Sequence, residues 1–335
     1  MKVLVTGGAG YIGSIAASQL LEAGHEVIVY DNLSTGNIQA VPQAATLIVG
    51  DIGDAASLKD VFERYPIDAV MHFAALIEAG ESMKTPEDFF RVNVAYTLTL
   101  LETMLRYGVQ RMVFSSTAAL YGDPERTPIA EGDRILPTNA YGETKLMVER
   151  MLDWMNRIHG LRYACLRYFN AAGAAGELGP DHHPESHLIP LILRVPLGKT
   201  KSVQIYGTDY DTSDGTCVRD YIHVSDLASA HVLALDRLET QSVLTYNLGN
   251  GRGFTVREVI EAARRITGHP IPAVEMPRRA GDPAVLIASS EKIKTDLGWV
   301  PKYADLETIL ASEWEWFQQH PGGYSAVEST ETAAA

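Results

Sequence analysis

A tyrosine and a lysine four residues apart, Tyr141 and Lys145, are the side chains of this sequence best suited to proton chemistry. Pro137, Thr138 and Asn139 precede them and predict a helix start, so the two side chains would lie one above the other on one helix face. A free phenol has a pKa near ~10 and is a poor base at neutral pH. A cation about 4 Å away supplies roughly the 4 kcal/mol that would bring this pKa to ~7 at an effective dielectric of ~20. The pair predicts a tyrosine base activated by lysine, although this spacing also occurs by chance on surface helices.

A glycine-rich turn follows the first expected strand of the chain. Gly8, Gly10 and Gly13 fit the pattern G-x-G-x-x-G, and a helical pattern comes after them. Glycines let the turn close and let the backbone approach a pyrophosphate at the helix N-terminus. The next expected strand ends in Asp31, about 20 residues beyond the glycines, where a carboxylate binds ribose hydroxyls. An acid there also repels a 2′-phosphate, so the sequence predicts NAD rather than NADP.

Expected strands alternate with helices through the first half of the chain. Such alternation predicts an α/β fold with a Rossmann-type, doubly wound parallel sheet, whose ligands bind at the carboxyl ends of the strands. Polar residues follow several of these ends, among them Asp51 and Thr117. The expected strands cover residues 2–6, 26–30, 46–49, 69–73, 111–115 and 161–168, and long helices are expected over residues 11–23, 86–107 and 141–159.

The character of the chain changes after residue 170. Residues 171–186 predict a loop, and the elements after it are shorter: helices over 187–197, 225–238, 255–267 and 306–319, and strands over 203–206 and 243–248. They predict a smaller, mixed α/β substrate-binding domain. We expect residues 1–170, joined by about 220–249, to form the NAD-binding domain, residues 171–219 and 250–320 the substrate domain, and residues 321–335 a frayed tail.

The composition of the 335 residues is that of an ordinary globular protein, 46% hydrophobic and 21% charged. The net charge of −14 argues against a nucleic-acid groove or an anionic membrane as a partner. The chain has no run of about 18 apolar residues, so no membrane span is expected, and its first residues lack a signal-peptide pattern. Two cysteines, Cys165 and Cys217, do not make a disulfide framework, so we expect a cytoplasmic protein.

Four stretches together resemble the extended short-chain dehydrogenase/reductase family, and within it the group of UDP-galactose (UDP-glucose) 4-epimerases. They are residues 7–13, 141–145, 167–170 and 214–224, of which the last reads D-G-T-C-V-R-D-Y-I-H-V and is the most distinctive. The resemblance covers about residues 1–320. It implies tightly bound NAD and reversible C4 epimerisation of UDP-glucose and UDP-galactose through a transient 4-keto sugar, with measurable activity on UDP-N-acetylhexosamines.

The resemblance also implies roles for individual residues. Tyr141 is the general base, Lys145 lowers its pKa and holds the nicotinamide ribose, and Thr117 hydrogen-bonds the sugar 4-oxygen. The implied NAD contacts are Gly7, Gly10, Tyr11, Ile12, Gly13, Asp31, Asn32, Leu33, Ser34, Thr35, Gly36, Asp51, Ile52, Phe73, Ala74, Ala75, Ile77, Asn93, Ser115, Tyr141, Lys145 and Tyr168. The implied UDP-sugar contacts are Thr117, Tyr141, Phe169, Asn170, His187, Leu188, Gln204, Ile205, Tyr206, Arg219, Arg279, Asp282 and Leu286.

Three positions bear on how the ligands would fit. Many family members carry lysine where Ile77 stands and asparagine where His187 stands; the imidazole still supplies a hydrogen-bond donor. Leu286 takes the place near the sugar C2 where a tyrosine narrows the pocket in other members, so a wider pocket is expected. By the same resemblance, the helices over 86–107 and 141–159 would pair with their copies as the four-helix interface of a homodimer.

Other interpretations remain open from the sequence. An epimerase of another nucleotide sugar, such as UDP-glucuronate, is the nearest, and residues 214–224 fit it poorly. A dehydratase needs an acid pair after Thr117, where Ala118 and Ala119 stand. A non-catalytic NAD-binding scaffold would be expected to lose one of the three catalytic residues, and all three are present.

Three histidines, His182, His183 and His187, lie close together in the sequence and raise the question of a metal site. No cysteine or aligned carboxylate completes a convincing set of ligands. We therefore expect no metal.

Overall fold

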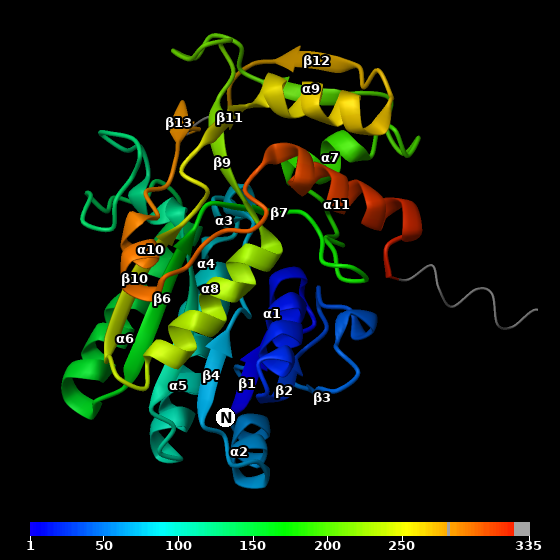
Figure 1. The fold of residues 1–335 in the computed structure, drawn as a ribbon. Coiled ribbons are helices and arrows are strands. Elements are labelled where there is room, and N and C mark those ends of the chain that lie inside the picture. The colour runs from blue at the N-terminus through cyan, green and yellow to red at the C-terminus, as the bar shows by residue number, and fades with distance from the viewer. Residues whose placement is uncertain (280–281, 325–335) are drawn as a thin grey trace, which may run out of the picture.

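The computed structural model describes residues 1–279 and 282–324. They fold around a seven-stranded sheet in which neighbouring strands run parallel (Figure 1). In sheet order the strands are β10 (Val243–Leu248), β6 (Arg162–Tyr168), β5 (Arg111–Thr117), β4 (Ala69–His72), β1 (Lys2–Thr6), β2 (Glu26–Asp31) and β3 (Thr46–Val49). The order reverses between β1 and β4, which confirms the predicted doubly wound, Rossmann-type fold.

Helices cover both faces of this sheet. They are α1 (Tyr11–Glu22) and α8 (Val224–Arg237) on one face, and α2 (Ala55–Arg64), α5 (Thr97–Arg106) and α6 (Ala140–His159) on the other. Successive side chains of a strand point to opposite faces, so Val3 and Val5 pack with α1 and α8 while Leu4 packs with the other three helices. All three residues are fully buried, as expected of a parallel strand covered on both sides.

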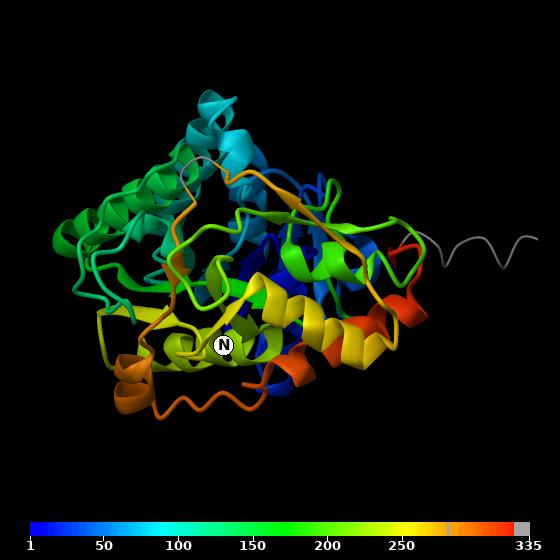
Figure 2. The ribbon, with the colours of Figure 1, turned by 90° about the horizontal axis from the view of Figure 1, so that it is seen from above.

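A second group of elements lies beyond the carboxyl ends of the main sheet (Figure 1). It has a four-stranded sheet of β7 (Asn170–Ala172), β9 (Val218–His223), β11 (Gly253–Thr255) and β13 (Val285–Leu286), and a pair of β8 (Val203–Tyr206) with β12 (Ala273–Met276). Helices α7 (Leu188–Leu193), α9 (Val256–Thr267) and α11 (Leu306–Gln319) pack together in a separate core, and Figure 2 shows α9 and α11 on the side opposite α6. The domain crossing expected at residue 220 falls inside β9. After β9 the chain returns to the main sheet through α8 and β10, and α10 (Glu291–Leu297) packs against both.

The long helix expected over residues 86–107 is interrupted. After the single turn α3 (Ala79–Ser82), α4 (Pro86–Phe89) runs into a π-helical segment, η2 (Phe90–Tyr96), before α5 begins. Within η2, the buried Asn93 binds the backbone of Leu76 through both its amide oxygen (2.8 Å) and its amide nitrogen (3.0 Å). The polar backbone contacts of the segment after β4 are therefore satisfied from inside a helix, a use typical of π-helical turns near functional sites. Two 3-10 turns, η1 (Ile38–Ala40) and η3 (Ala118–Tyr121), complete the described elements.

The last described residues are ordered by side-chain contacts. Tyr324 is buried, its backbone N–H donates to the Asp181 carboxylate at 3.0 Å, and its hydroxyl accepts the Gly179 N–H at 2.9 Å. Its ring packs edge-on against Trp316 of α11. The predicted fraying is therefore wrong for residues 321–324, because Tyr324 anchors them. The polar residues around Tyr324 did not indicate such an anchor. Residues 325–335 lie outside the described part of the chain.

A buried ion pair ties α6 to the main sheet. The Arg167 guanidinium of β6 donates to the Glu149 carboxylate of α6 at 2.6 and 3.0 Å, and both side chains are less than 10% exposed. Ser116 of β5 donates to the same carboxylate at 2.6 Å. A charge pair in the interior is costly to break, because the partner left behind remains buried without compensation.

We expect Glu149→Gln to destabilise the protein by about 3–5 kcal/mol, since it leaves the Arg167 cation unpaired at nearly constant volume. The urea midpoint of unfolding, compared between variant and wild type, measures this loss. Asp153→Asn on the same helix is the matched control, because its pair with Arg157 is exposed and should change stability by less than about 0.5 kcal/mol. Equal midpoints for the two variants would show that the buried pair contributes no more than a surface pair.

Candidate active site

A cavity of about 1240 Å³ lies where the carboxyl ends of the main sheet face the second group of elements. Each strand from β1 to β6 delivers a lining residue at or just after its end. In chain order these are Gly10, Asp31, Asp51, Phe73, Thr117 and Tyr168. The carboxyl ends of parallel strands share one edge of the sheet, so residues that are far apart in sequence converge there.

The glycine turn is packed too closely for side chains at two positions. Gly7 has φ +73°, and a Cβ there would lie 2.5 Å from the backbone nitrogen of Ala74. A Cβ on Gly13 would lie 2.2 Å from the carbonyl oxygen of Gly7. The bare backbone of the turn consequently forms part of the cavity wall at the N-terminus of α1, as a pyrophosphate site requires.

Asp31 is fixed beside this turn at the end of β2. Its carboxylate accepts the backbone N–H groups of Ala9 and Leu33, each at 2.9 Å, and the residue also lines the cavity. The two backbone N–H groups therefore hold the carboxylate in place, and the remaining lone pairs of its oxygens can accept hydrogen bonds from a ligand. This is the position at which the sequence predicted a ribose contact.

Tyr141 lies in the first turn of α6, as the sequence predicted. Asn139 caps this helix, its side-chain oxygen accepting the Gly142 N–H at 2.8 Å. Lys145 lies one turn farther on and is buried, and its Nζ donates to the carbonyl oxygen of Ser115 in β5 at 2.9 Å. The same nitrogen is 5.9 Å from the centre of the Tyr141 ring, so the two side chains share a face without a direct hydrogen bond between them.

Burial of both side chains opposes the expected activation of Tyr141 by Lys145. Burial, with a smaller contribution from Tyr168, raises the pKa of Tyr141 well above its ordinary value, although a hydrogen bond with Thr117 opposes the rise. Burial also lowers the pKa of Lys145 to about 7, which weakens it as a cation. Removal of the phenol and the amine from water disfavours the charged form of each, and the spacing of the two residues in the sequence does not reveal this cost.

Most of the predicted contact residues line the cavity. From the predicted NAD set these are Gly7, Gly10, Tyr11, Ile12, Gly13, Asp31, Asn32, Ser34, Thr35, Gly36, Asp51, Ile52, Phe73, Ala74, Ala75, Ile77, Tyr141 and Tyr168. From the predicted substrate set they are Thr117, Tyr141, Phe169, Asn170, His187, Leu188, Gln204, Tyr206, Arg219, Arg279 and Asp282.

Five predicted contacts are not among the residues that line the cavity; they are Leu33, Asn93, Ser115, Lys145 and Ile205. Asn93 binds the backbone after β4, and Ser115 hydrogen-bonds the Tyr168 hydroxyl at 2.6 Å while its carbonyl holds Lys145. Leu33 packs against the core at a positive φ, and Ile205 is buried because it alternates with Gln204 and Tyr206, which face the cavity. Alternation along β8 was the available signal for Ile205.

Leu286 is the sixth residue that departs from expectation. It pairs with Arg219 across β13 and β9, and its side chain packs in a small apolar cluster with Tyr121, Ile129 and Phe169. Phe169 lines the cavity and Leu286 does not. Leu286 packs against the same apolar cluster as Phe169, and its predicted contact with the sugar stays a prediction.

Two arginines gather at the far end of the cavity. Arg219 lies 3.4 Å from the carboxylate of Asp282, and the Arg279 guanidinium stacks 3.9 Å above the ring of Tyr206. Both arginines reach the cavity from the second group of elements. A planar guanidinium suits a diphosphate, so the acidic chain carries its anion-binding groups locally.

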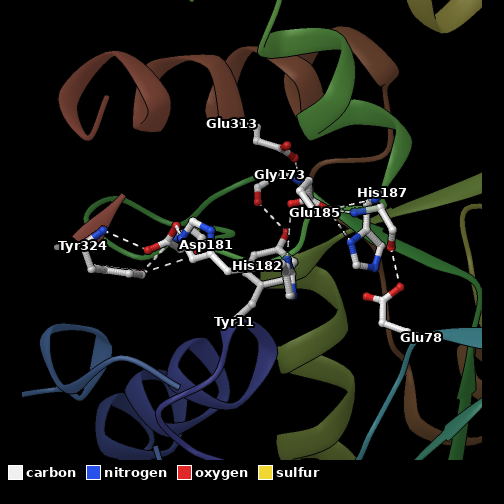
Figure 3. A network of polar contacts seen from close by, with 12 residues as sticks. Tyr11, Glu78, Gly173, Asp181, His182, Glu185, His187, Glu313 and Tyr324 are labelled. Atoms are coloured by element: carbon white, nitrogen blue, oxygen red, sulfur yellow. Dashed lines mark hydrogen bonds and ion pairs between the residues drawn. The ribbon is translucent and has the colours of Figure 1, made fainter. Parts of the chain in front are cut away.

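Several residues that line the cavity were not predicted from the sequence. Glu78, just after β4, accepts a hydrogen bond from Ser186 at 2.6 Å and so links the cofactor side of the cavity to the loop over residues 179–187 (Figure 3). Glu313 of α11 is fully buried, and its carboxylate accepts the Gly173 N–H at 2.9 Å. The helical spacing of Leu306, Ile309 and Glu313 places this acid on the buried stripe, which was the signal that could have identified it.

The loop over residues 179–187 also brings a carboxylate between two of the histidines. Glu185 contacts His182 and His187, whereas His183 turns away and pairs with Asp181 at 3.0 Å. The expectation that no aligned carboxylate accompanies the histidines is therefore wrong.

Burial raises the pKa of Glu313 to about 8, with a smaller contribution from the charge of Glu185. The folded protein therefore binds this proton more tightly than the unfolded chain, and the associated stability declines as the pH rises from about 4.5 through about 8. Glu313→Gln removes the titration and keeps the acceptor for Gly173. We expect the urea midpoint of this variant, relative to wild type, to rise progressively between about pH 5 and about pH 8.

Glu315→Gln on the exposed face of α11 is the control for Glu313→Gln and should show no such trend. A constant difference between Glu313→Gln and wild type across this pH range would mean that Glu313 titrates near its ordinary pKa.

Comparisons with known proteins agree on one family. The model of the NAD dependent epimerase/dehydratase family matches residues 3–249. A UDP-glucose 4-epimerase from Halalkalibacterium halodurans is 55% identical over 97% of this chain and 98% of its own. A crystal structure of a UDP-glucose 4-epimerase, 49% identical, gives a TM-score of 0.95 over 97% of this chain and 99% of that chain. A UDP-glucose 4-epimerase from Bifidobacterium longum in complex with NAD+ and UDP is 39% identical, with a TM-score of 0.92 over 97% and 100%.

These likenesses confirm the resemblance drawn from the four sequence stretches.

Across the described residues, no helix is both long and apolar enough to cross a membrane.

Proposed function

Because the chain belongs to the NAD dependent epimerase/dehydratase family, we propose that it interconverts UDP-glucose and UDP-galactose by inverting C4, with NAD held in the cavity. The observation that carries the proposal is that one cavity joins a bare glycine turn, a buried Tyr141 and a pair of guanidinium groups. Its volume of about 1240 Å³ suits two ligands that meet there, a dinucleotide at the strand ends and a nucleotide sugar at the second group of elements.

The residues of the cofactor side fit NAD. The glycine turn has no room for side chains at Gly7 and Gly13, and Asp31 offers a fixed carboxylate that favours ribose hydroxyls over a 2′-phosphate. NAD held there would supply reversible hydride transfer at C4 of the sugar. Lys145 would hold the nicotinamide ribose, and the positive nicotinamide charge offsets the burial that now raises the pKa of Tyr141.

Tyr141 and Thr117 handle the proton. Tyr141 would take the proton of the 4-hydroxyl as hydride leaves C4, and it would give the proton back when hydride returns. Thr117 lies at the end of β5 and lines the same part of the cavity, where its hydroxyl would hydrogen-bond the 4-oxygen. Proton transfer by a positioned side chain contributes about 10²–10⁴-fold to a rate.

The far end of the cavity would hold the diphosphate. Arg219 and Arg279 would bind its oxygens, and Asp282 orients the first of them. Anchoring UDP at these groups lets the 4-keto sugar turn about its link to the diphosphate and present its other face. The curated relatives are named for glucose, whereas a similar Campylobacter jejuni enzyme, 43% identical, is named for both glucose and N-acetylglucosamine. We therefore propose glucose and galactose as the main substrates, with measurable activity on the N-acetylated sugars.

The experiment that tests the function is turnover of UDP-galactose to UDP-glucose by the purified protein without added NAD. We expect Tyr141→Phe to lower kcat at least ~10²-fold with NAD still bound, because the general base is lost while the cofactor side is unchanged. Tyr303→Phe, an exposed tyrosine outside the cavity, is the matched control and should retain full activity. Bound NAD without turnover of any UDP-sugar would support a scaffold instead, and near-normal kcat in Tyr141→Phe would remove this residue from the mechanism.

A second copy of the chain would cover an apolar face of α6. Trp154 and Ile158, one turn apart on this face, are 60% and 67% exposed, and Leu98 of the neighbouring α5 is 36% exposed. Four helices, two from each copy, would bury these side chains in a homodimer.

Both cysteines are free and buried, which suits the reducing cytoplasm that we propose as the location of the protein.

We expect Trp154→Arg to convert the dimer to a monomer, because a charge at the centre of the apolar contact remains unpaired. Light scattering after gel filtration gives the mass directly. Val300→Arg is the control, since Val300 is 71% exposed away from these helices, and this variant should keep the mass of wild type. A wild-type protein that elutes as a monomer would exclude the interface.

A further inference from the structure

The loop over residues 179–187 holds two imidazoles and a carboxylate in ligating reach of one another. The ligand atoms of His182, Glu185 and His187 all lie within 4.8 Å, and Figure 3 shows the three side chains pointing toward one another. Among the described residues, none forms a hydrogen bond with the buried Nδ1 atom of His182, which lies 3.5 Å from Oε2 of Glu185. Buried polar atoms are nearly always hydrogen-bonded, so this nitrogen calls for an explanation.

The loop itself positions the carboxylate. Oε1 of Glu185 accepts the backbone N–H groups of Ser186 at 2.8 Å and His187 at 2.7 Å, and the His187 ring lies at 2.7 Å from the same oxygen. The Glu185 side chain is only 2% exposed. Its second oxygen is left facing His182, so the carboxylate is held from one side and open on the other.

We propose that His182, Glu185 and His187 form a binding site for a divalent transition metal ion, with Zn²⁺ as the best match. Two imidazole nitrogens and one carboxylate oxygen are a donor set that Zn²⁺ takes in proteins, with bonds of about 2.0–2.2 Å. In tetrahedral geometry such bonds place two ligand atoms about 3.3 Å apart. The separation of 3.5 Å between His182 and Glu185 is close to this value, and small side-chain rotations open the 2.7 Å contact of His187.

The site would leave part of the metal's coordination open to the cavity. His182 and His187 line the cavity wall, whereas Glu185 supports them from behind. Three protein ligands leave a fourth position for water or an anion, as in zinc sites that are not purely structural. The proposal is independent of the proposed epimerisation, because metal binding is measured without turnover.

The test is a Zn²⁺ titration of the NAD-loaded protein, free of any histidine tag, by calorimetry, with the bound metal counted by elemental analysis. We expect one Zn²⁺ per chain in wild type. His182→Phe keeps the ring beside Tyr11 but removes a ligand, and Glu185→Gln removes the anionic donor. Each should weaken binding at least ~10-fold, since even substitutions beyond the ligand shell cost about 10–100-fold.

His183→Phe is the matched control, because His183 lies in the same loop, is 72% exposed and pairs with Asp181 instead. It should bind Zn²⁺ like wild type. Unchanged affinity in His182→Phe and Glu185→Gln, or loss of affinity in His183→Phe, would overturn the assignment.

Wild type alone gives a second readout that does not depend on the folding of variants. Co²⁺ should produce the visible absorption bands of a four- or five-coordinate ion, and Zn²⁺ should abolish them by displacement. A wild-type spectrum without these bands would also overturn the proposal.

Discussion

The burial of Tyr141 and Lys145 at the carboxyl end of β5 is the constraint on which the chemistry depends. Removal from water disfavours both charged forms, so the pKa of Tyr141 is raised and that of Lys145 is lowered to about 7. Lys145 satisfies its buried amine through the Ser115 carbonyl rather than through the phenol. Burial therefore favours the neutral phenol in the protein alone, and a positive charge that enters the site would favour the phenolate, which is the form that acts as a base. A cofactor that carries such a charge completes the site electrostatically as well as chemically.

Contacts between the surrounding elements hold the buried Tyr141 and Lys145 in position. Asn139 sets where α6 begins, and the buried pair of Glu149 with Arg167 fixes its second and third turns against β5 and β6. Because Ser116 also binds Glu149, the strand that carries Thr117 and the helix that carries Tyr141 share one hydrogen-bond network. The relative position of Thr117 and Tyr141 is thus set by contacts outside the cavity.

The sequence predicts those parts of the molecule that depend on local patterns. The glycine turn, Asp31 and the first turn of α6 each carry their signal within a few residues, and alternation of strands and helices fixes the parallel sheet and the edge where ligands bind. The errors fall where a side chain's direction depends on distant neighbours. The π-helical turn that buries Asn93 and the two-residue strand that pairs Leu286 with Arg219 are set by tertiary contacts. The loop that seats Glu185 between two histidines has no helical or strand period to reveal its shape.

The two ends of the cavity are built differently, and the proposed reaction needs that difference. At the strand ends, backbone and buried side chains are fixed by short hydrogen bonds, as around Asp31 and Ser115. At the far end, Arg279 rests on the face of Tyr206 and Arg219 meets Asp282 at 3.4 Å, contacts that charged ligand oxygens can readily replace. A sugar that must present both faces to one hydride acceptor cannot be gripped by its ring. In the proposed reaction its binding energy would come largely from the diphosphate, so the arginines would determine how long the sugar stays, while Tyr141 and Thr117 would act on whichever face is presented.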